Sequence, residues 1–318
     1  MRPSVVDVLA HRMAAPTGST GATARPDGYR VCLVIEGGGS RAAYSTGMVG
    51  ALQKRGLTAC FDAVYGSSAG ALNGAWLLCD RAPNAMAAWT APGLMRKVMN
   101  VPRAVYGRPV VDIDYLVNVL YTDLVPIDFE AVLANPVSLH PIGTDAADGA
   151  AVDLASLISD VPTLKLALQA TSNLPVMAGP PVALGGGRFI DGGVAEPVPI
   201  QTALAQGATH VLVLRTRRPD ELSAPPGRLA RRFTTRWFRR HAPGATPAWD
   251  HRPARAIELE RLLAESSNVL QIRPPVGSPP VSRIATDAGL LGSAVDIGFR
   301  AAEEVLAGLD SSGEPGAV

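Results

Sequence analysis

The sequence has few of the residues that build disulfide scaffolds or metal centres, with three cysteines and five histidines among 318 residues. Cys32, Cys60 and Cys79 lie in apolar segments without metal-ligand spacing, which predicts buried free thiols in a reducing compartment. Aromatic residues make up only 5% of the chain, whereas glycines number 32 and prolines 27. The core is therefore expected to consist mainly of Ala, Val and Leu side chains.

Long apolar runs and a strong net charge are also missing. No run of about eighteen apolar residues occurs, so no membrane-spanning helix is expected. The formal net charge is +1, so no global field draws the protein to nucleic acid or to a membrane. Residues 1–28 lack the features of a signal peptide and contain many breakers, which predicts a disordered or loosely attached tail. We expect a cytoplasmic protein with at most a peripheral membrane association.

The rest of the chain alternates strand-like and helix-like segments. Apolar and β-branched runs predict strands at residues 31–35, 61–65, 137–144, 188–190, 210–215 and 268–274. Helical spacing predicts helices at residues 42–53, 69–79, 164–169, 200–205 and 289–309. This alternation predicts a doubly wound α/β domain over residues 29–310, with a mostly parallel sheet, helices on both faces and the ligand at the carboxyl ends of the strands. Residues 311–318 would form a C-terminal tail.

Two segments interrupt this alternation. Residues 85–124 carry apolar residues at helical spacing with prolines between the pieces. They predict a helical cap, which could be a packed helical pair or a lipid-contacting lid. Residues 216–256 form an insertion rich in Arg and Pro.

Inside the insertion, a predicted helix within residues 228–244 places arginines beside aromatic residues. This composition is typical of an interfacial membrane helix, and a solvated surface helix is the alternative. Nucleic acid would compete for such a patch, but it is not expected because the overall charge is near zero and no nucleic-acid motif accompanies the helix. The candidate residues for contact with an anionic membrane surface are Arg231, Arg232, Arg236, Trp237, Phe238, Arg239 and Arg240.

The stretch VYGSSAGALNG, residues 64–74, contains a Gly-x-Ser-x-Gly pattern. A strand-like run precedes it and helical spacing follows, so Ser68 would lie at a sharp strand-to-helix turn that the two glycines permit. The helix N-terminus beneath the hydroxyl would favour developing negative charge. Ser68 is therefore the candidate nucleophile, and a flexible Gly/Ser loop is the alternative.

A second strand-to-helix turn contains Gly37, Gly38 and Gly39. Three backbone N–H groups at a helix N-terminus predict an anion site, for a phosphate or for the oxyanion of an acyl transfer. Neither the Walker spacing nor Gly-x-Gly-x-x-Gly is present, which argues against a nucleotide. Arg41 follows the turn and could contact a lipid phosphate or hold the shape of the loop.

The sequence offers two kinds of general base for Ser68. Asp191 ends a short predicted strand and precedes Gly192 and Gly193, which places its carboxylate at a tight turn, although Asp-Gly turns are common. A histidine would also satisfy the usual order of hydrolase residues, but none lies in a motif that fixes its position. The histidines that follow Ser68 in the chain are His140, His210, His241 and His251.

The segments EGGGSRAAYSTG, GSSAG and DGG, in this order, resemble the motifs of the patatin-like phospholipases, a family of lipid acyl hydrolases. LQATSNLPVMAGPPV resembles the family's Ala-Ser and Pro segment, and the likeness spans residues 31–214. The resemblance implies a three-layer α/β fold and a dyad in which Asp191 accepts the proton of Ser68. It also implies that the amides of Gly37, Gly38 and Gly39 bind the oxyanion, and that no metal or cofactor is used.

From these motifs we expect a serine lipid acyl hydrolase that cleaves carboxylic esters of phospholipids or related acyl lipids. An acyltransferase with the same dyad is an alternative, and so is a catalytically silent module that binds lipid or nucleotide.

Overall fold

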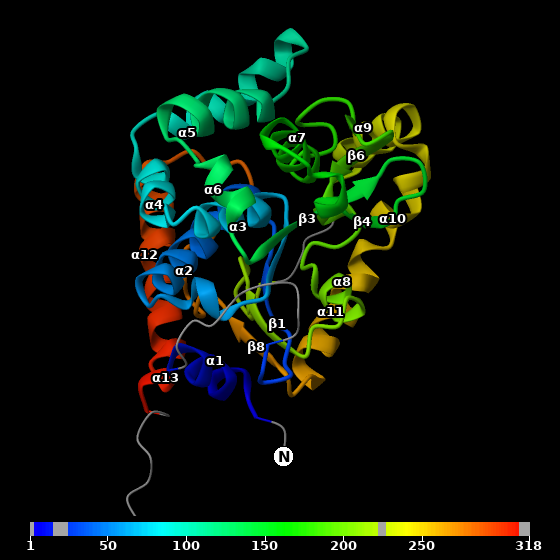
Figure 1. Cartoon of the computed structure of the whole chain (residues 1–318). Helices are drawn as coiled ribbons and strands as arrows, with labels where there is room; N and C mark the ends of the chain where they lie inside the picture. Colours follow the sequence, from blue (N-terminus) through cyan, green and yellow to red (C-terminus); the bar gives the residue numbers. More distant parts are fainter. Residues whose placement is uncertain (1–2, 15–24, 222–226, 312–318) are drawn as a thin grey trace, which may run out of the picture.

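A sheet of eight strands forms the centre of the computed structural model, which describes residues 3–14, 25–221 and 227–311 (Figure 1). Five strands run parallel in the order β3-β2-β1-β7-β8. Their bounds are β1 (Val31–Ile35), β2 (Ala63–Ser67), β3 (Ser138–Asp145), β7 (His210–Leu214) and β8 (Val269–Ile272). The antiparallel strands β4 (Ala151–Asp153), β5 (Val182–Leu184) and β6 (Gly187–Asp191) extend the sheet beyond β3.

Helices cover both faces of this sheet, so the domain has three layers (Figure 1). One face packs against α2 (Ala42–Lys54), α3 (Ala69–Leu78) and α12 (Ala288–Leu306), and the other against α8 (Ile200–Ala205) and α11 (Arg252–Glu265). All five residues of β1 are buried, because alternate side chains enter the two separate cores. The predicted fold class is confirmed.

The closest helix pairing in the domain depends on two glycines. A Cβ at Gly47 of α2 would overlap the Val295 carbonyl of α12, and a Cβ at Gly298 of α12 would overlap the Tyr44 carbonyl of α2. The backbones of α2 and α12 therefore meet directly. Because α2 follows the turn after β1, this contact places α12 beside that turn.

The six predicted strands are all present, with their ends shifted by at most two residues. The predicted helices correspond to α2, α3, α7 (Val161–Thr171), α8 and α12. The smaller elements of the main domain are η1 (Gly39–Arg41), η2 (Leu57–Cys60), α6 (Phe129–Ala134), η5 (Leu154–Leu157), η6 (Gly192–Val194) and α13 (Gly308–Ser311). The prediction was incomplete at β6, because this strand runs antiparallel to its neighbour β3.

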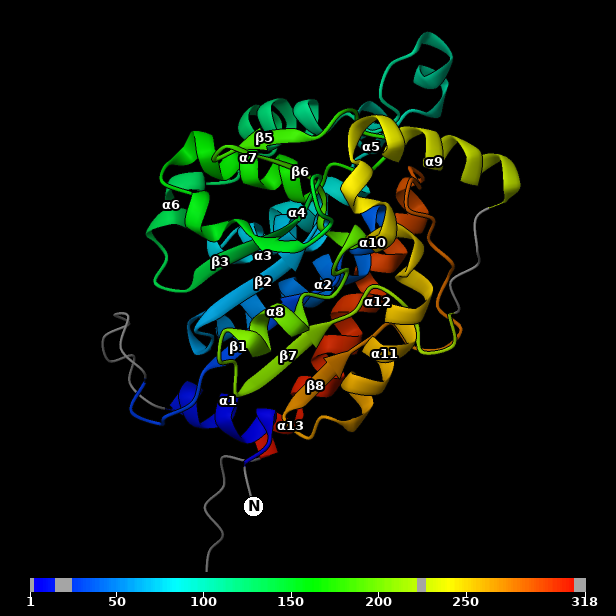
Figure 2. The ribbon, with the colours of Figure 1, turned by 90° about the vertical axis from the view of Figure 1, so that its right-hand side faces the viewer.

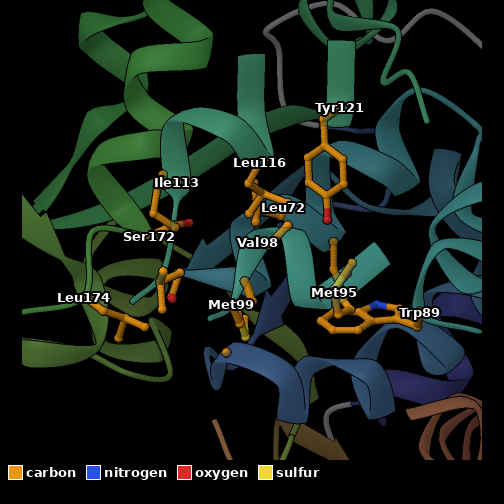
Figure 3. A pocket seen from close by; sticks show the side chains of 15 residues that line it. Leu72, Trp89, Met95, Val98, Met99, Ile113, Leu116, Tyr121, Ser172 and Leu174 are labelled. Carbon is orange, nitrogen blue, oxygen red and sulfur yellow. The ribbon is translucent and has the colours of Figure 1, made fainter. Parts of the chain in front are cut away.

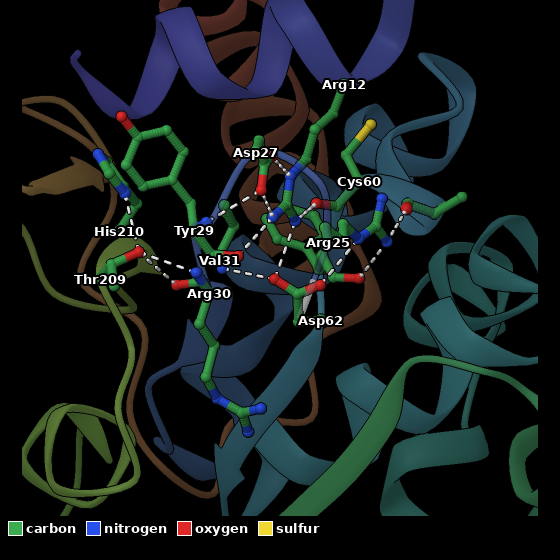
Figure 4. A network of polar contacts seen from close by, with 12 residues as sticks. Arg12, Arg25, Asp27, Tyr29, Arg30, Val31, Cys60, Asp62, Thr209 and His210 are labelled. Atoms are coloured by element: carbon green, nitrogen blue, oxygen red, sulfur yellow. Dashed lines mark hydrogen bonds and ion pairs between the residues drawn. The ribbon is translucent and has the colours of Figure 1, made fainter. Parts of the chain in front are cut away.

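The expected loose attachment of residues 1–28 is wrong for residues 5–14. They form α1 (Val5–Ala14), whose residues Val5, Val8 and Leu9 are buried in the main core. The Arg12 side chain ties the helix to Asp27 and Asp62 through ion pairs of 2.7 and 2.9 Å (Figure 4). The spacing of the three apolar residues is helical and could have been recognised in the sequence. Residues 15–24 and 312–318 lie outside the described residues.

The cap over residues 85–124 lies at the carboxyl end of the parallel strands, opposite α1 and α13 (Figures 1 and 2). It contains α4 (Ala82–Thr90), α5 (Leu94–Val98), η3 (Val101–Tyr106) and the π-helix η4 (Tyr115–Leu124). The insertion over residues 216–256 contains α9 (Arg228–His241), η7 (Pro243–Ala245) and α10 (Thr246–Asp250) and leads into α11. Within the described residues, no helix is both long enough and apolar enough to cross a membrane.

Candidate active site

Ser68 occupies the sharp turn between β2 and α3. Its backbone has φ 56° and ψ −132°, a conformation rarely adopted by a residue with a side chain. The turn is this tight because Gly66 and Gly70 lack side chains. A Cβ at Gly66 would overlap the Ala71 backbone, and one at Gly70 would overlap the Ile35 carbonyl. The Gly-x-Ser-x-Gly pattern therefore forms the predicted strained turn.

The two adjacent serines of this turn have different surroundings. The Ser67 hydroxyl donates a hydrogen bond of 2.6 Å to the Glu196 carbonyl, so it is held inside the fold. Ser68 donates its backbone N–H to the Thr171 hydroxyl at 2.9 Å, and its own hydroxyl lines a pocket. Only Ser68 has the placement of a nucleophile.

Asp191 reaches this turn by an antiparallel route. Ser67, the last residue of β2, lies beside Ile142 of β3, but β3 continues past that point. The returning strand β6 pairs with the extension and ends with Asp191 beside Gly143. Since Gly143 directly follows Ile142, the carboxylate is delivered next to the end of β2. The predicted strand end is confirmed, whereas the direction of the strand could not be predicted.

The Asp191 carboxylate is buried, with 4% of the residue exposed. One oxygen, Oδ1, accepts the Gly193 N–H at 2.8 Å, whereas Oδ2 has no hydrogen-bond partner among the described residues. Burial raises the pKa of Asp191, and this rise is opposed by a hydrogen bond from Ser68, by the Gly193 N–H and by the charges of Arg283 and Arg252. The Ser68 hydroxyl therefore affects the pKa of this carboxylate, although it forms no hydrogen bond to Oδ2 that meets the usual distance and angle limits. The structure brings the two predicted catalytic residues together.

A short segment at the end of α7 holds both residues in place. The Thr171 hydroxyl accepts the Ser68 N–H and donates to the Ile142 carbonyl, while the Asn173 carbonyl accepts the Asp191 N–H at 2.9 Å. Sequence reasoning identified this segment by its likeness to a family motif but assigned no role to Thr171. Its role depends on contacts with β2, β3 and β6, which are distant in the sequence.

The triple-glycine loop lies against the nucleophile. A Cβ at Gly37 would lie 3.1 Å from the Cβ of Ser68. The Gly37 N–H donates to the Pro197 carbonyl at 3.0 Å, so the expectation that it binds an oxyanion is wrong in this structure. The N–H groups of Gly38 and Gly39 have no acceptor within the described residues. Two of the three predicted donors are therefore available.

Arg41 follows this loop and is mostly buried, with 9% of the residue exposed. Its Nη1 lies 3.9 Å from the nearest oxygen of Glu221, too far for a hydrogen bond, and its Nε has no partner among the described residues. Burial, followed by the charge of Arg217, lowers the pKa of Arg41 to about 10. An arginine in this state suits an anionic ligand better than a purely structural role.

An apolar pocket with a cavity volume of about 40 Å³ is lined by Ser68. Figure 3 shows most of its lining side chains. Its far wall comes from the cap, and its near wall comes from α3 and the segment after α7. Most of the lining side chains are apolar, among them Leu72, Trp89, Met95, Val98, Met99, Ile113, Leu116, Tyr121 and Leu174. Ser172 also lines the pocket, and its hydroxyl is buried without a partner among the described residues.

The histidines have other partners. His140 lies 2.6 Å from an Asp153 oxygen and stacks on Tyr65, and His210 contacts Thr209 and the Pro3 carbonyl. Within the described residues, none of the five histidines is bonded to Ser68. The three cysteines are free and buried, as predicted.

The basic helix α9 agrees only in part with the sequence prediction. Its arginines are exposed at positions 231, 232, 236, 239 and 240, and Trp237 is partly buried. Phe238 is fully buried and packs against Trp249, with ring centroids 5.1 Å apart, so its assignment as a membrane-facing residue is wrong. The exposed aromatic side chain of this helix is Phe233.

Comparison with known proteins decides the family. The profile of the patatin-like phospholipases matches residues 33–204, more than half of the chain. The chain belongs to this family. Membership confirms the resemblance seen in the sequence. The patatin-like match includes Ser68 and Asp191 and ends before α9.

The patatin-like chain is also similar to individual proteins. It is 26% identical over 215 residues to the uncharacterized protein YjjU of Escherichia coli K12, covering 66% of this chain and 56% of YjjU. It thus spans just over half the length of this curated relative. VipD from Legionella pneumophila has 14% identity and a TM-score of 0.39, over 88% of this chain and 67% of VipD. Human GIVD cytosolic phospholipase A2 has 11% identity and a TM-score of 0.41, over 97% of this chain and 63% of that protein.

Proposed function

We propose that the protein is a serine lipid acyl hydrolase that cleaves carboxylic esters with a Ser68–Asp191 dyad. The observation that carries the proposal is the adjacency of the strained Ser68 turn and the buried Asp191 carboxylate, whose Oδ2 has no other partner among the described residues. Burial raises the pKa of Asp191, and a carboxylate of raised pKa is a stronger base than an exposed aspartate.

The reaction follows from the positions of these groups. Ser68 Oγ attacks the ester carbonyl carbon while Asp191 accepts the hydroxyl proton. The negative charge that develops on the carbonyl oxygen is stabilised by the N–H groups of Gly38 and Gly39, each worth about 3 kcal/mol in comparable sites. Asp191 then returns the proton to the leaving alcohol. Water then attacks the acyl carbon while Asp191 accepts a water proton. The Ser68 Oγ–acyl bond breaks, Asp191 returns the proton to Oγ, and the fatty acid is released.

The apolar pocket supports an acyl lipid as the substrate. It begins at Ser68 and is lined almost entirely by apolar side chains, so it suits the hydrocarbon chain of the acyl group (Figure 3). The cap supplies much of this lining, through residues such as Trp89, Met95 and Leu116. In this proposal the cap is neither a plain helical pair nor a detached lid but one wall of the acyl site.

A peripheral contact with an anionic membrane completes the proposal. The η3 tip of the cap exposes Val105 and Tyr106, at 85% and 80%, and α9 exposes its arginines and Phe233. Both elements project at the end of the molecule where the parallel strands terminate, the end that holds Ser68 (Figures 1 and 2). Apolar side chains flanked by arginines suit the boundary between headgroups and acyl chains. Sedimentation with liposomes tests this contact. Arg236→Glu and Tyr106→Asp should each weaken binding to anionic vesicles. Wild-type protein that binds neutral vesicles as strongly as anionic ones would contradict the proposed contact.

The catalytic proposal is tested by hydrolysis of p-nitrophenyl esters and of phospholipids. Ser68→Ala should reduce kcat at least about 10⁴-fold, because the nucleophile is removed. Ser67→Ala is the matched control, since it removes a neighbouring hydroxyl that only bonds to the Glu196 carbonyl. A Ser68→Ala enzyme with wild-type activity would refute the dyad.

A further inference from the structure

Four arginines converge near the dyad from separate parts of the chain. Arg41 follows the triple-glycine loop, Arg217 follows β7, Arg252 begins α11, and Arg283 lies between β8 and α12. Three of them, Arg217, Arg252 and Arg283, lie outside the segment that matches the family profile. Their placement is therefore a property of this chain's C-terminal third.

Backbone contacts fix two of these arginines at the oxyanion loop. The Arg283 carbonyl accepts the Ser40 N–H at 2.8 Å and lies directly against Gly39, whose φ is +57°. The hydroxyl of Thr216, the residue before Arg217, donates to the Gly37 carbonyl at 3.0 Å. The loop that faces the nucleophile is thus held between Thr216, which directly precedes Arg217, and Arg283.

Arg252 is fixed by an aromatic side chain. Its guanidinium lies 3.1 Å from the ring centroid of Trp249, and its Nε donates to the Trp249 carbonyl at 3.2 Å. Stacking on an aromatic ring holds the guanidinium plane while its remaining N–H groups stay available for a ligand.

Two of the four arginines have no carboxylate partner within the described residues. Neither Arg252 nor Arg283 has an ion-pair partner among the described residues. Glu36, which interacts with Arg217 at 3.7 Å, is already bonded to Arg215 at 2.9 Å. The Arg41 Nε is buried without a partner in the described structure. The guanidinium charges of Arg252 and Arg283 are therefore not neutralised by an ion pair among the described residues.

The charges of the cluster also act on one another and on Asp191. Burial, then the charges of Arg283 and Arg255, lowers the pKa of Arg252 to about 10. Burial also lowers the pKa of Arg283, and Arg217 contributes to this decrease. The Asp191 carboxylate opposes both decreases. Arg252 and Arg283 thus lie within electrostatic reach of the Asp191 carboxylate.

We propose that Arg217, Arg252 and Arg283, together with Arg41, form a subsite for a phosphate group carried by the acyl lipid close to the ester that is cleaved. This proposal rests on the proposed function and names its substrate class as anionic acyl lipids of the lysophosphatidic acid type. Guanidinium groups bind phosphate oxygens in pairs, and such bonds are strong when water is partly excluded. The acyl chain would occupy the pocket on the cap side, and the phosphate would occupy the arginine side of the dyad.

The test compares two substrates that differ only in the phosphate: lysophosphatidic acid and the monoacylglycerol with the same chain. Wild-type enzyme should prefer the phosphate-bearing substrate, mainly through a lower KM. In Arg252→Gln and Arg283→Gln the ratio of the two kcat/KM values should fall about tenfold each, because each variant loses bonds to a charged group. Arg300→Gln, which removes an exposed arginine of α12, is the matched control and should leave the ratio unchanged.

A binding measurement separates this proposal from the catalytic one. Calorimetric binding of lysophosphatidic acid to Ser68→Ala needs no turnover, and it should weaken about tenfold when Arg283→Gln is added. Free inorganic phosphate could occupy the same subsite as the lipid phosphate. It should bind more weakly than the lipid and should compete with it. An unchanged substrate ratio together with unchanged lipid binding would overturn the subsite. Binding of inorganic phosphate without competition against the lipid would also overturn it. Lost hydrolysis with intact, Arg283-dependent binding would refute the dyad and leave the subsite standing.

Discussion

The two ends of the sheet both contain arginines and aspartates, but they use them in opposite ways. At the amino end, Arg12 donates hydrogen bonds to both Asp27 and Asp62 and to the carbonyls of Cys60 and Tyr29 (Figure 4). Arg25 binds the second oxygen of Asp62 at 2.8 Å. At the carboxyl end, Asp191 Oδ2 and Arg41 Nε have no partner in the described structure.

This difference separates stability from function. The paired network at the amino end fixes α1 and the start of β1, where Val31 donates its N–H to Asp62 at 2.7 Å. Unpaired buried groups and a strained turn at the carboxyl end are unfavourable for folding, and such groups persist where a ligand or a reaction uses them. Substitutions at the two ends should therefore affect different quantities.

The largest effect should come from Asp191→Asn, which removes the base but keeps an oxygen that can accept the Gly193 N–H. We expect kcat to fall about 10³-fold to 10⁴-fold, because an amide cannot take the serine proton. Ester hydrolysis under saturating substrate measures this loss. Activity within tenfold of the wild type would contradict the role of Asp191.

The same substitution should raise stability at neutral pH. Burial raises the pKa of Asp191 above the usual 3.8, so the folded state binds this proton more tightly than the unfolded state. The wild type therefore loses unfolding free energy as pH rises from 3.8 through the raised pKa, and Asp191→Asn avoids this loss. Thermal unfolding should show a higher Tm for the variant at pH 7, and the difference should shrink toward pH 4. For the same reason, wild-type kcat should fall as pH drops through the raised pKa.

Much of the fold and the positions of Ser68 and Asp191 could be predicted from the sequence, whereas the Arg12 network could not. Ser68 and Asp191 were found because glycines mark tight turns locally, and β1 was found because a strand buried on both faces is continuously apolar. The bond from Gly37 to Pro197, the role of Thr171 and the arginine cluster all join residues far apart in the chain, so no local pattern reveals them. Phe238 was misassigned because helical spacing places it on the aromatic face of α9 but does not show that Trp249 of α10 packs against it.

Arg12→Ala tests the amino end. The substitution leaves Asp27 without its arginine partner and removes one of the two arginines bound to Asp62, and we expect a loss of about 3 kcal/mol in the free energy of unfolding. Urea unfolding measures this change. The kcat of the folded fraction should stay at the wild-type value, since Arg12 lies at the opposite end of the sheet from Ser68. A large decrease in the kcat of the folded protein would contradict this separation of stability from function.

Gly39→Ala tests the oxyanion loop. A Cβ there would overlap the Arg283 carbonyl, and the φ of +57° disfavours alanine, so the free N–H groups of the loop should be displaced. We expect kcat to fall about 10²-fold, as when one oxyanion donor is lost. Gly56→Ala is the control, because it has a similar φ of +69° with open space around its Cβ, far from the site.

Thr171→Val should have the smallest effect. It keeps the shape of the side chain but removes the acceptor for the Ser68 N–H, and we expect kcat to fall about tenfold through loss of one positioning hydrogen bond. Thr171→Ser should restore most of the activity, because it restores the hydroxyl. Equal activity in the Val and Ser variants would show that the bond does not position Ser68.

The most direct test of the dyad is labelling with a fluorophosphonate, followed by mass spectrometry of the adduct. We expect one adduct, on Ser68, which forms slowly in Asp191→Asn and is unaffected in Ser67→Ala. An adduct on Ser67 or Ser172, or labelling of Ser68 that is equally fast without Asp191, would contradict it.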